Sequence, residues 1–244
     1  MTSDSKDTLY RHRHDAVSEF IFDQNVVRVF PDMIKRSVPG YGTILHMIGY
    51  LAGKYVQPNS NCYDLGCSLG AVTLAMVEKI NQANVTIYAV DNSNQMISQC
   101  EKNFHTGRFS TPIYFYCEDI VGTNIANASF CVANFTLQFI DPIKRDELIQ
   151  KIYNGMCRDG IFILSEKIKF EDDQHENLVA DLHHYFKKSN GYSEMEIAKK
   201  REALENVLIP ETISSHRNRL LSAGFKSVDL WFQCFNFISL IAIK

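Results

Sequence analysis

The ten residues 61–70, NCYDLGCSLG, constrain the fold more than any other part of the chain. They read as a strand, a turn through Gly66, Ser68 and Gly70, and the start of the helical pattern AVTLAMVEKI. A second strand, VTIYAV, ends in Asp91 about 20 residues past the turn. This layout is typical of an α/β crossover that binds a nucleotide, because glycines let a ligand approach the backbone and the acid can accept both ribose hydroxyls.

The turn departs from the dinucleotide fingerprint G-x-G-x-x-G, because Ser68 stands in place of the middle glycine. The pattern D-x-G-x-[GS]-x-G favours the S-adenosylmethionine class, in which an amino-acid tail rather than a pyrophosphate lies over the turn. The alternative is an ordinary tight strand-to-helix turn followed by an incidental acid. The nucleotide interpretation is preferred because turn, helix and acid occur together at the right spacing.

Strand-like and helix-like segments alternate along most of the chain, which predicts a mostly parallel sheet covered on both faces. The short connection at Asn236 predicts an antiparallel hairpin at the end. We therefore expect an α/β three-layer sandwich with a seven-stranded, mostly parallel sheet, methyltransferase-type and Rossmann-like. The predicted strands are 60–65, 85–90, 112–117, 128–134, 160–167, 226–233 and 236–243, and the helices between them are 69–80, 94–104, 142–156 and 211–223.

Two helical additions to this single domain, which spans 1–244, are expected. The first is an N-terminal helical cap over 14–57, with an amphipathic helix at 14–37 and a second helix at 43–55. Pro31, like the later Pro-Gly pair, is expected to break the helical pattern.

The second addition is a polar, charged helical insertion over 171–208, placed before the last two strands. Asn190-Gly191 divides it into two helices. Ser193 and Glu196 form a capping box for the second helix.

Composition excludes several classes of protein. The chain has 244 residues, 45% of them hydrophobic, which fits one globular domain with a sizeable core. No apolar run approaches the ~20 residues of a membrane helix, and the N-terminal residues lack the apolar centre of a signal peptide, so a cytoplasmic location without membrane contact is expected. Seven scattered cysteines without a CxxC pair suggest neither a metal site nor a disulfide framework. A net charge of −3 disfavours direct nucleic-acid binding.

Ligands of such sheets bind beyond the carboxyl ends of the strands, so the residues there are the candidate contacts. An acid after strand three can accept the adenine amino hydrogens. Asp91 and Asp119 could instead be turn or cap residues, and Asn134 could simply cap a strand. The segment after strand four, NFTLQF, lacks the Asn/Asp-Pro-Pro-Tyr of many amino methyltransferases, and no general base or nucleophile is evident. The candidates are Gly66, Cys67, Ser68, Asp91, Asn92, Asp119, Ile120 and Asn134.

An arginine occupies an apolar stripe in the second helix of the insertion. Ile197, Arg201, Leu204 and Leu208 fall on one face at helical spacing. A planar guanidinium facing a packed surface is well matched to a carboxylate. Alternatively, Arg201 extends to solvent or pairs with a nearby glutamate such as Glu205.

Longer segments carry a resemblance to one family. DLGCSLG, AVDNS, YCEDI, ANFTLQF, HHYFKKSNGYSEMEIAKKREALENVL and LWFQCFNF resemble the carboxy-S-adenosyl-L-methionine synthase family, over nearly the whole chain from FDQNVVRVFPDMIKRSVPGY onward. The resemblance implies a transferase without metal that uses S-adenosyl-L-methionine as a substrate together with prephenate and releases phenylpyruvate. It further implies that a partner enzyme passes the carboxymethyl group of the product to a wobble uridine of tRNA.

The resemblance also implies roles for individual residues. Arg201 is the catalytic candidate and, in a homodimer, reaches into the pocket of the neighbouring subunit. The sequence does not show how prephenate is held, and Arg201, Arg36, His183 and Tyr185 are the candidates for it. The implied ligand contacts are Tyr41, Gly66, Cys67, Ser68, Asp91, Asn92, Asp119, Ile120, Asn134 and Arg201.

Two other functions stay open. One is a conventional S-adenosylmethionine-dependent methyltransferase, in which the arginine holds the carboxylate of a small acidic substrate. The other is a cofactor-binding subunit without turnover that supports a tRNA-modifying partner.

Overall fold

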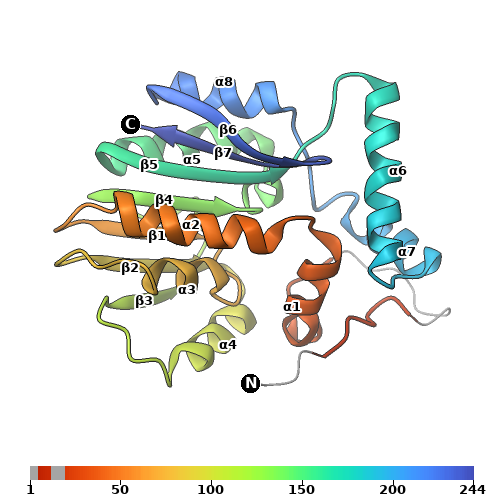
Figure 1. Cartoon of the computed structure of the whole chain (residues 1–244), viewed down its shortest axis with the longest axis horizontal. Helices are drawn as coiled ribbons and strands as arrows, with labels where there is room; N and C mark the ends of the chain where they lie inside the picture. The colour runs from red at the N-terminus through yellow and green to blue at the C-terminus, as the bar shows by residue number, and fades with distance from the viewer. Residues whose placement is uncertain (1–4, 12–19) are drawn as a thin grey trace.

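A seven-stranded sheet runs through the molecule, in a computed structural model that describes residues 5–11 and 20–244 (Figure 1). The strand order is β3-β2-β1-β4-β5-β7-β6. Only β7 runs antiparallel to its neighbours, so the predicted sheet and its final hairpin are confirmed. The strands are β1 (Asn61–Leu65), β2 (Thr86–Asp91), β3 (Ile113–Cys117), β4 (Ala128–Asn134), β5 (Met156–Lys167), β6 (Ser227–Cys234) and β7 (Phe237–Ile243).

Helices cover both faces of the sheet, which makes the predicted three layers. One face packs on α5 and α8, and the other packs on α2, α3 and α4. Fully buried side chains such as Ile48 and Ile149 fill the two interfaces, and each contributes about 1.5–3 kcal/mol through burial. The helices are α1 (Gln24–Ser37), α2 (Tyr41–Tyr55), α3 (Ala71–Val77), α4 (Asn94–Phe104), α5 (Pro142–Gly155), α6 (Asp173–Ser189), α7 (Glu194–Leu204) and α8 (Ile213–Ala223), with a 3-10 turn, η1 (Leu137–Phe139).

The first helix is shorter than the predicted 14–37. Residues 12–19 lie outside the described ranges, and residues 20–23 are not helical. Asp23 caps α1, because its carboxylate accepts hydrogen bonds from the N–H groups of Asn25 and Val26, at 2.9 and 3.0 Å. Pro31 lies inside α1 and does not break it. Its missing N–H removes one helical hydrogen bond, and the buried residues Val27 and Met33 hold the helix in place nevertheless.

The insertion consists of two helices, as predicted, but the second ends earlier than residue 208. Gly191 has φ +85° between the helices, and the capping box of Ser193 and Glu196 is present. The helix α7 ends at Leu204, followed by turns. Pro210 follows closely, and a proline disfavours helical geometry in the residue before it.

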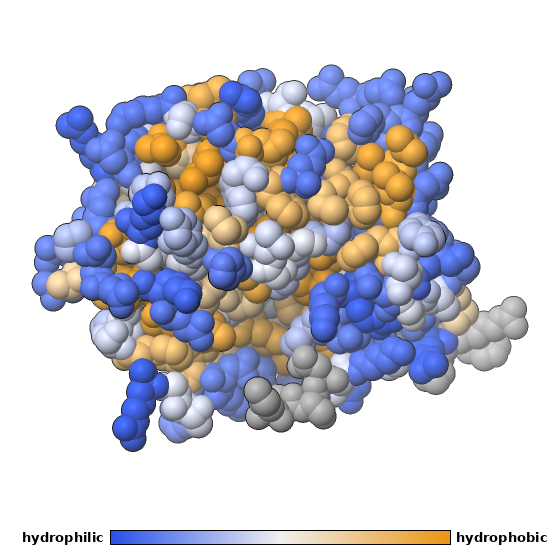
Figure 2. Space-filling view, in the orientation of Figure 1, coloured by the Kyte–Doolittle hydropathy of each residue, from blue (hydrophilic) through white to orange (hydrophobic). Residues whose placement is uncertain are grey.

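The helices α1, α6 and α7 stand together at one edge of the sheet (Figure 1). This is the edge where β5 ends and the chain passes into α6. The face in view mixes hydrophilic and hydrophobic side chains, with hydrophilic ones gathered toward its margins (Figure 2). Among the described residues, no helix is both long and apolar enough to cross a membrane.

Candidate functional site

The turn after β1 holds its backbone against β2. The N–H groups of Gly66 and Cys67 both donate to the carbonyl oxygen of Val90, at 2.8 and 2.9 Å. Gly66 has φ +81°, and a Cβ there would lie 2.3 Å from Oγ1 of Thr136. Only glycine fits this conformation and this close approach. The turn is therefore fixed next to the segment that follows β4.

Asp91 joins the turn to the end of β2. Its carboxylate accepts the N–H groups of Ser68 and Ser93, each at 2.9 Å. Burial raises the pKa of Asp91, and these two hydrogen bonds oppose the shift. Asp91, the last residue of β2, thus stabilises the turn after β1. Each carboxylate oxygen keeps acceptor capacity for a ligand hydroxyl, so the ribose role stays a prediction.

The end of β3 lies beside Asp91, because the N–H of Glu118 donates to the Asp91 carbonyl oxygen at 3.1 Å. Asp119 is exposed, and its carboxylate accepts the N–H of Val121 at 2.9 Å. Ile120 is buried. The predicted contacts after β1, β2 and β3 therefore meet at one edge of the sheet.

Asn134, at the end of β4, has a buried side-chain oxygen without a hydrogen-bond partner among the described residues. Such an oxygen costs about 1–3 kcal/mol unless a donor reaches it. Phe135 follows with φ +61°, and its ring lies 6.3 Å from that of Tyr41. Burial and then the charge of Asp64 raise the pKa of Tyr41. Asn134 and Tyr41 thus border the same edge.

Cys67 contributes backbone rather than thiol chemistry. Its side chain is buried among Ala89 and Ile97. A hydrogen bond with Cys100, then burial, raise the pKa of the Cys67 thiol well above its ordinary value. A protonated, buried thiol is inert as a nucleophile. Within the described residues, no three histidine, cysteine, aspartate or glutamate side chains are grouped so that they could hold a metal.

Arg201 lies apart from these residues, on α7. Ile197 in the proposed stripe is buried and Leu204 half-buried, whereas Arg201 is exposed in the single chain. Its positive charge lowers the pKa of Lys167 and of Lys187, so it lies near the end of β5 and near α6. The contact of Arg201 with a neighbouring subunit stays a prediction.

Two of the candidates for holding prephenate are occupied within the fold. Arg36 donates to the carbonyl oxygen of Asn190 at 2.7 Å and to Asp32 at 3.1 Å, and its guanidinium lies 3.8 Å from the centre of the Tyr192 ring. His183 donates from Nε2 to the carbonyl oxygen of residue 37 at 2.8 Å. These side chains fasten α1 to the insertion.

The charge state of His183 and the exposure of Tyr185 also disfavour these two candidates as prephenate-binding residues. Burial lowers the pKa of His183 to about 3, which leaves it neutral. Tyr185 is 71% exposed. Sequence reasoning did not single out Lys167 and Lys187, whose pKa values are lowered first by burial and also by the charge of Arg201. The available signal was that Lys167 is the last residue of a predicted strand, where ligand contacts are expected.

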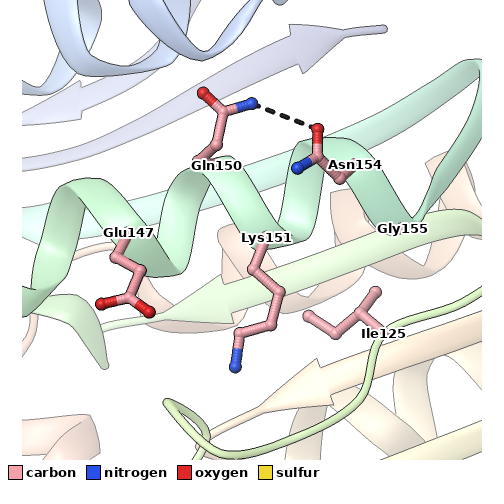
Figure 3. A pocket seen from close by; sticks show the side chains of 6 residues that line it. All are labelled: Ile125, Glu147, Gln150, Lys151, Asn154 and Gly155. Atoms are coloured by element: carbon pink, nitrogen blue, oxygen red, sulfur yellow. Dashed lines mark hydrogen bonds between the residues drawn. The ribbon is translucent and has the colours of Figure 1, made fainter.

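A separate pocket of about 460 Å³ lies over α5 (Figure 3). Gly155 immediately precedes β5 and Ile125 lies shortly before β4, so this pocket is at the amino edge of the sheet, opposite the candidate site. The Gln150 amide donates to Asn154 at 3.2 Å, and the Lys151 amine to the carbonyl oxygen of Val121. The lining residues are Ile125, Glu147, Gln150, Lys151, Asn154 and Gly155.

Comparisons with known proteins agree with the geometry. A family model described as a methyltransferase domain matches residues 63–160. The carboxy-S-adenosyl-L-methionine synthase of Pseudoalteromonas atlantica is 54% identical, with 98% of each chain covered. The synthase of the same name from Shewanella woodyi is 52% identical, with 98% of this chain and 99% of the other covered. The structure of human N-acetylserotonin methyltransferase in complex with S-adenosyl-L-methionine has a TM-score of 0.60 at 15% identity, covering 90% of this chain and 55% of that one.

Proposed function

The chain belongs to the carboxy-S-adenosyl-L-methionine synthase family, and from this premise we propose that it converts S-adenosyl-L-methionine and prephenate into carboxy-S-adenosyl-L-methionine and phenylpyruvate. The enzyme is a transferase with a methyltransferase fold. The reaction places a carboxyl group on the former methyl carbon instead of transferring the methyl group.

The S-adenosyl-L-methionine binds along the carboxyl edge of β1 to β4 in this proposal. The backbone of 66–68 contacts the amino-acid tail, and Asp91 and Asn92 accept the ribose hydroxyls. The adenine ring lies against Asp119 and Ile120. The unpaired buried oxygen of Asn134 supports a ligand at the mouth of the reaction centre, with Tyr41 and Phe135 beside it.

The bonding changes balance without a separate protein base. Prephenate loses one carboxylate as carbon dioxide, and aromatisation of its ring expels the ring hydroxyl as hydroxide. Positive sulfur acidifies the methyl C–H bonds, so this hydroxide takes a methyl proton and leaves as water. The resulting carbanion attacks the carbon dioxide, and the new C–C bond completes the transfer. The protein need only hold the reactants together and exclude water.

The observation that carries the proposal is that two features meet at one edge of the sheet. One is the nucleotide turn with its acid, Asp91. The other is the positive charge of Lys167 at the end of β5 and of Lys187 on α6, to which Arg201 of the neighbouring subunit adds a guanidinium in this proposal. The product carries a new carboxylate beside the sulfur, which a guanidinium stabilises. A plain methyl transfer creates no such anion on the nucleoside.

The assembly and the pathway belong to the same proposal. The enzyme acts as a homodimer, with Arg201 of each subunit completing the pocket of the other. The exposure of Arg201 in the single chain supports this arrangement. The product then serves a separate enzyme that carboxymethylates a wobble uridine of tRNA in the cytoplasm, and this chain has no direct contact with the nucleic acid.

The test is to incubate the purified protein with S-adenosyl-L-methionine and prephenate and to weigh the nucleoside product by mass spectrometry. A nucleoside heavier than S-adenosyl-L-methionine by one carboxyl group is expected, formed in step with phenylpyruvate. Bound S-adenosyl-L-methionine without turnover would instead identify a non-catalytic cofactor-binding subunit.

The second candidate function is a conventional methyltransferase acting on a small acidic substrate, which the match to a methyltransferase domain favours. It predicts S-adenosylhomocysteine formed in step with a methylated acceptor. Supplying candidate acids in place of prephenate distinguishes the two reactions. S-adenosylhomocysteine that is bound without turnover supports neither function, since the nucleoside site would accept it in either case.

A further inference from the structure

A second group of side chains borders the candidate site on the side away from the nucleotide turn. Lys167 ends β5, and its sheet partner is Phe237, the first residue of β7. Lys187 lies on α6, one turn after His183, so both project from the same face of that helix. The ring of His183 lies 4.9 Å from that of Phe237. This contact brings the Lys187 face of α6 to the edge where Lys167 lies.

The two lysines are close to each other and to Arg201. Burial lowers the pKa of Lys167, and Arg201 lowers it further while Glu176 opposes the shift. Burial, then the charges of Lys167 and Arg201, lower the pKa of Lys187 to about 8. The three cations therefore disfavour one another's charged form in a partly desolvated place.

Two buried arginines in the described part of the chain are paired with carboxylates, whereas these three cations are not. Arg145 pairs with Glu211 at 2.6 Å, and Arg36 pairs with Asp32 at 3.1 Å. Within residues 5–11 and 20–244, no carboxylate lies within ion-pair distance of Lys167, Lys187 or Arg201 (the ion pairs found there involve other residues). A fold that gathers unneutralised cations pays a repulsive cost that a bound anion removes.

An apolar wall and a hydrogen-bonding group lie beside these cations. The rings of Phe135 and Phe237 are 5.9 Å apart, and Phe135 directly follows Asn134 of the nucleotide edge. Asn236, between β6 and β7, is 3% exposed, and its side-chain oxygen has no partner in the described part of the chain. Its carbonyl oxygen accepts the N–H of Ile168, next to Lys167, at 2.7 Å.

We propose that Lys167 and Lys187 bind the two carboxylates of the second substrate, a ring-containing dicarboxylate, whose ring packs on Phe135 and Phe237. This assignment rests on the proposed function, since that function requires such a substrate. The unpaired side-chain oxygen of Asn236 accepts a hydrogen bond from the ring hydroxyl. Arg201 of the neighbouring subunit keeps its separate role at the carboxylate of the nucleoside product. The position of Phe135, immediately after Asn134, puts the second substrate in contact with the first.

Substitutions of Lys187 on α6 and of Lys167 on β5 test the assignment by steady-state kinetics, with a control on the residue next to Lys187. Lys187→Gln should raise the KM for prephenate at least roughly 30-fold, as for a desolvated charge pair that loses one partner, and Lys167→Gln should do the same. The affinity for S-adenosyl-L-methionine alone, measured by calorimetry, should stay unchanged in both. The matched control is Lys188→Gln, because Lys188 pairs with Glu194 and faces solvent; it should leave KM unchanged.

The outcomes separate this inference from the proposed function. If the wild-type protein makes no carboxylated nucleoside, the proposed function fails. If it does, and both lysine variants keep the wild-type KM, the lysine site is wrong while the function stands. Should Lys187→Gln also weaken S-adenosyl-L-methionine binding, Lys187→Arg decides, because it keeps the charge: a KM near wild type supports the site, and a persistent defect overturns it.

A second readout requires no turnover. With S-adenosylhomocysteine bound, which has no methyl group to carboxylate, acetic anhydride labels accessible amines, and mass spectrometry reports the extent at each lysine. Prephenate should protect Lys167 and Lys187 and leave Lys188 unprotected. Equal labelling of all three with and without prephenate would overturn the assignment.

Discussion

At the scale of single residues, Arg201 is expected to determine affinity for the carboxylated product. Arg201→Ala should cost about 2–5 kcal/mol of binding free energy for carboxy-S-adenosyl-L-methionine, because it removes one member of a desolvated charge pair. Arg201→Lys should recover only part, because the bidentate geometry is lost. Calorimetry with the purified product measures both, with Arg217→Ala, an exposed site on α8, as the control. Wild-type affinity in Arg201→Ala would refute the role.

The lowered pKa of Lys187 predicts that, as the pH rises above 8, kcat/KM for prephenate falls while the contribution of Lys187 to the free energy of unfolding rises. Its pKa is lowered from 10.5 to about 8, so it loses its charge above pH 8 and kcat/KM for prephenate should fall there. The unfolded chain still binds that proton up to about pH 10.5, so the contribution of Lys187 to the free energy of unfolding rises between pH 8 and 10.5.

Variants can assign the fall of kcat/KM above pH 8, the alkaline limb of the pH profile, to one side chain. Lys167 from β5, Arg201 and Lys200 from α7, and His183 from α6 itself face Lys187. Burial also lowers the pKa of Lys200 to about 8, so Lys200 is the competing origin. Lys187→Arg stays charged and should move the limb to higher pH. A limb that stays near pH 8 in Lys187→Arg and moves in Lys200→Arg would contradict the assignment.

Sequence reasoning succeeds for residues whose neighbours are close along the chain. Gly66, Ser68 and Asp91 belong to one strand–helix–strand crossover, whose geometry nearly fixes their relation. Lys167 and Lys187 are different, because they meet only when α6 folds back over the end of β5. The place of Lys167 at the end of a predicted strand was a local signal, but Lys187 looked like an ordinary surface charge, and no local rule predicts that the two come together.

At the scale of elements, the N-terminal helix and the insertion are expected to act as one unit. Arg36→Met should lower the free energy of unfolding by about 3 kcal/mol, because it leaves Asp32 and two backbone carbonyl oxygens without their donor. It should also raise the KM for prephenate, because α6 then relies on the His183 contact to α1. Urea unfolding and steady-state kinetics measure the two effects.

Arg28→Met provides the comparison for this prediction, since Arg28 is exposed on the same helix. It should change neither quantity appreciably. A stable Arg36→Met protein with an unaltered KM would mean that α6 keeps its position without α1. The sequence predicted both helical additions but not their attachment, because Arg36 and Asn190 are far apart in the chain. Their contact depends on the tertiary packing around Tyr192.

At the scale of the whole molecule, the order of the strands follows from the alternating pattern, but the assembly does not. Hydrophobic periodicity reports which faces a chain buries within itself. A residue such as Arg201, exposed in one subunit and proposed to act in the other, carries no such signal. The subunit to which each catalytic contribution belongs therefore requires an experiment on mixed dimers.

Heterodimers made from two differently tagged chains and purified through both tags provide that experiment. In the first, one chain carries Asp91→Ala and the other carries Arg201→Ala. If Arg201 completes its neighbour's pocket, one of the two sites receives an intact acid and an intact arginine, and about half of the wild-type activity returns by the symmetry of the dimer. If Arg201 serves its own subunit, each site keeps one defect and the heterodimer is no more active than either parent.

The reciprocal heterodimer tests the same prediction with the expected outcomes reversed. It pairs a wild-type chain with a chain carrying both Asp91→Ala and Arg201→Ala. An arginine acting across the interface leaves one site without its acid and the other without its arginine, so activity should be lost. An arginine acting within its own subunit would instead preserve one complete site and about half of the activity. Because the two heterodimers contain the same four chain positions and the same two substitutions, a general loss of stability cannot produce opposite results in them.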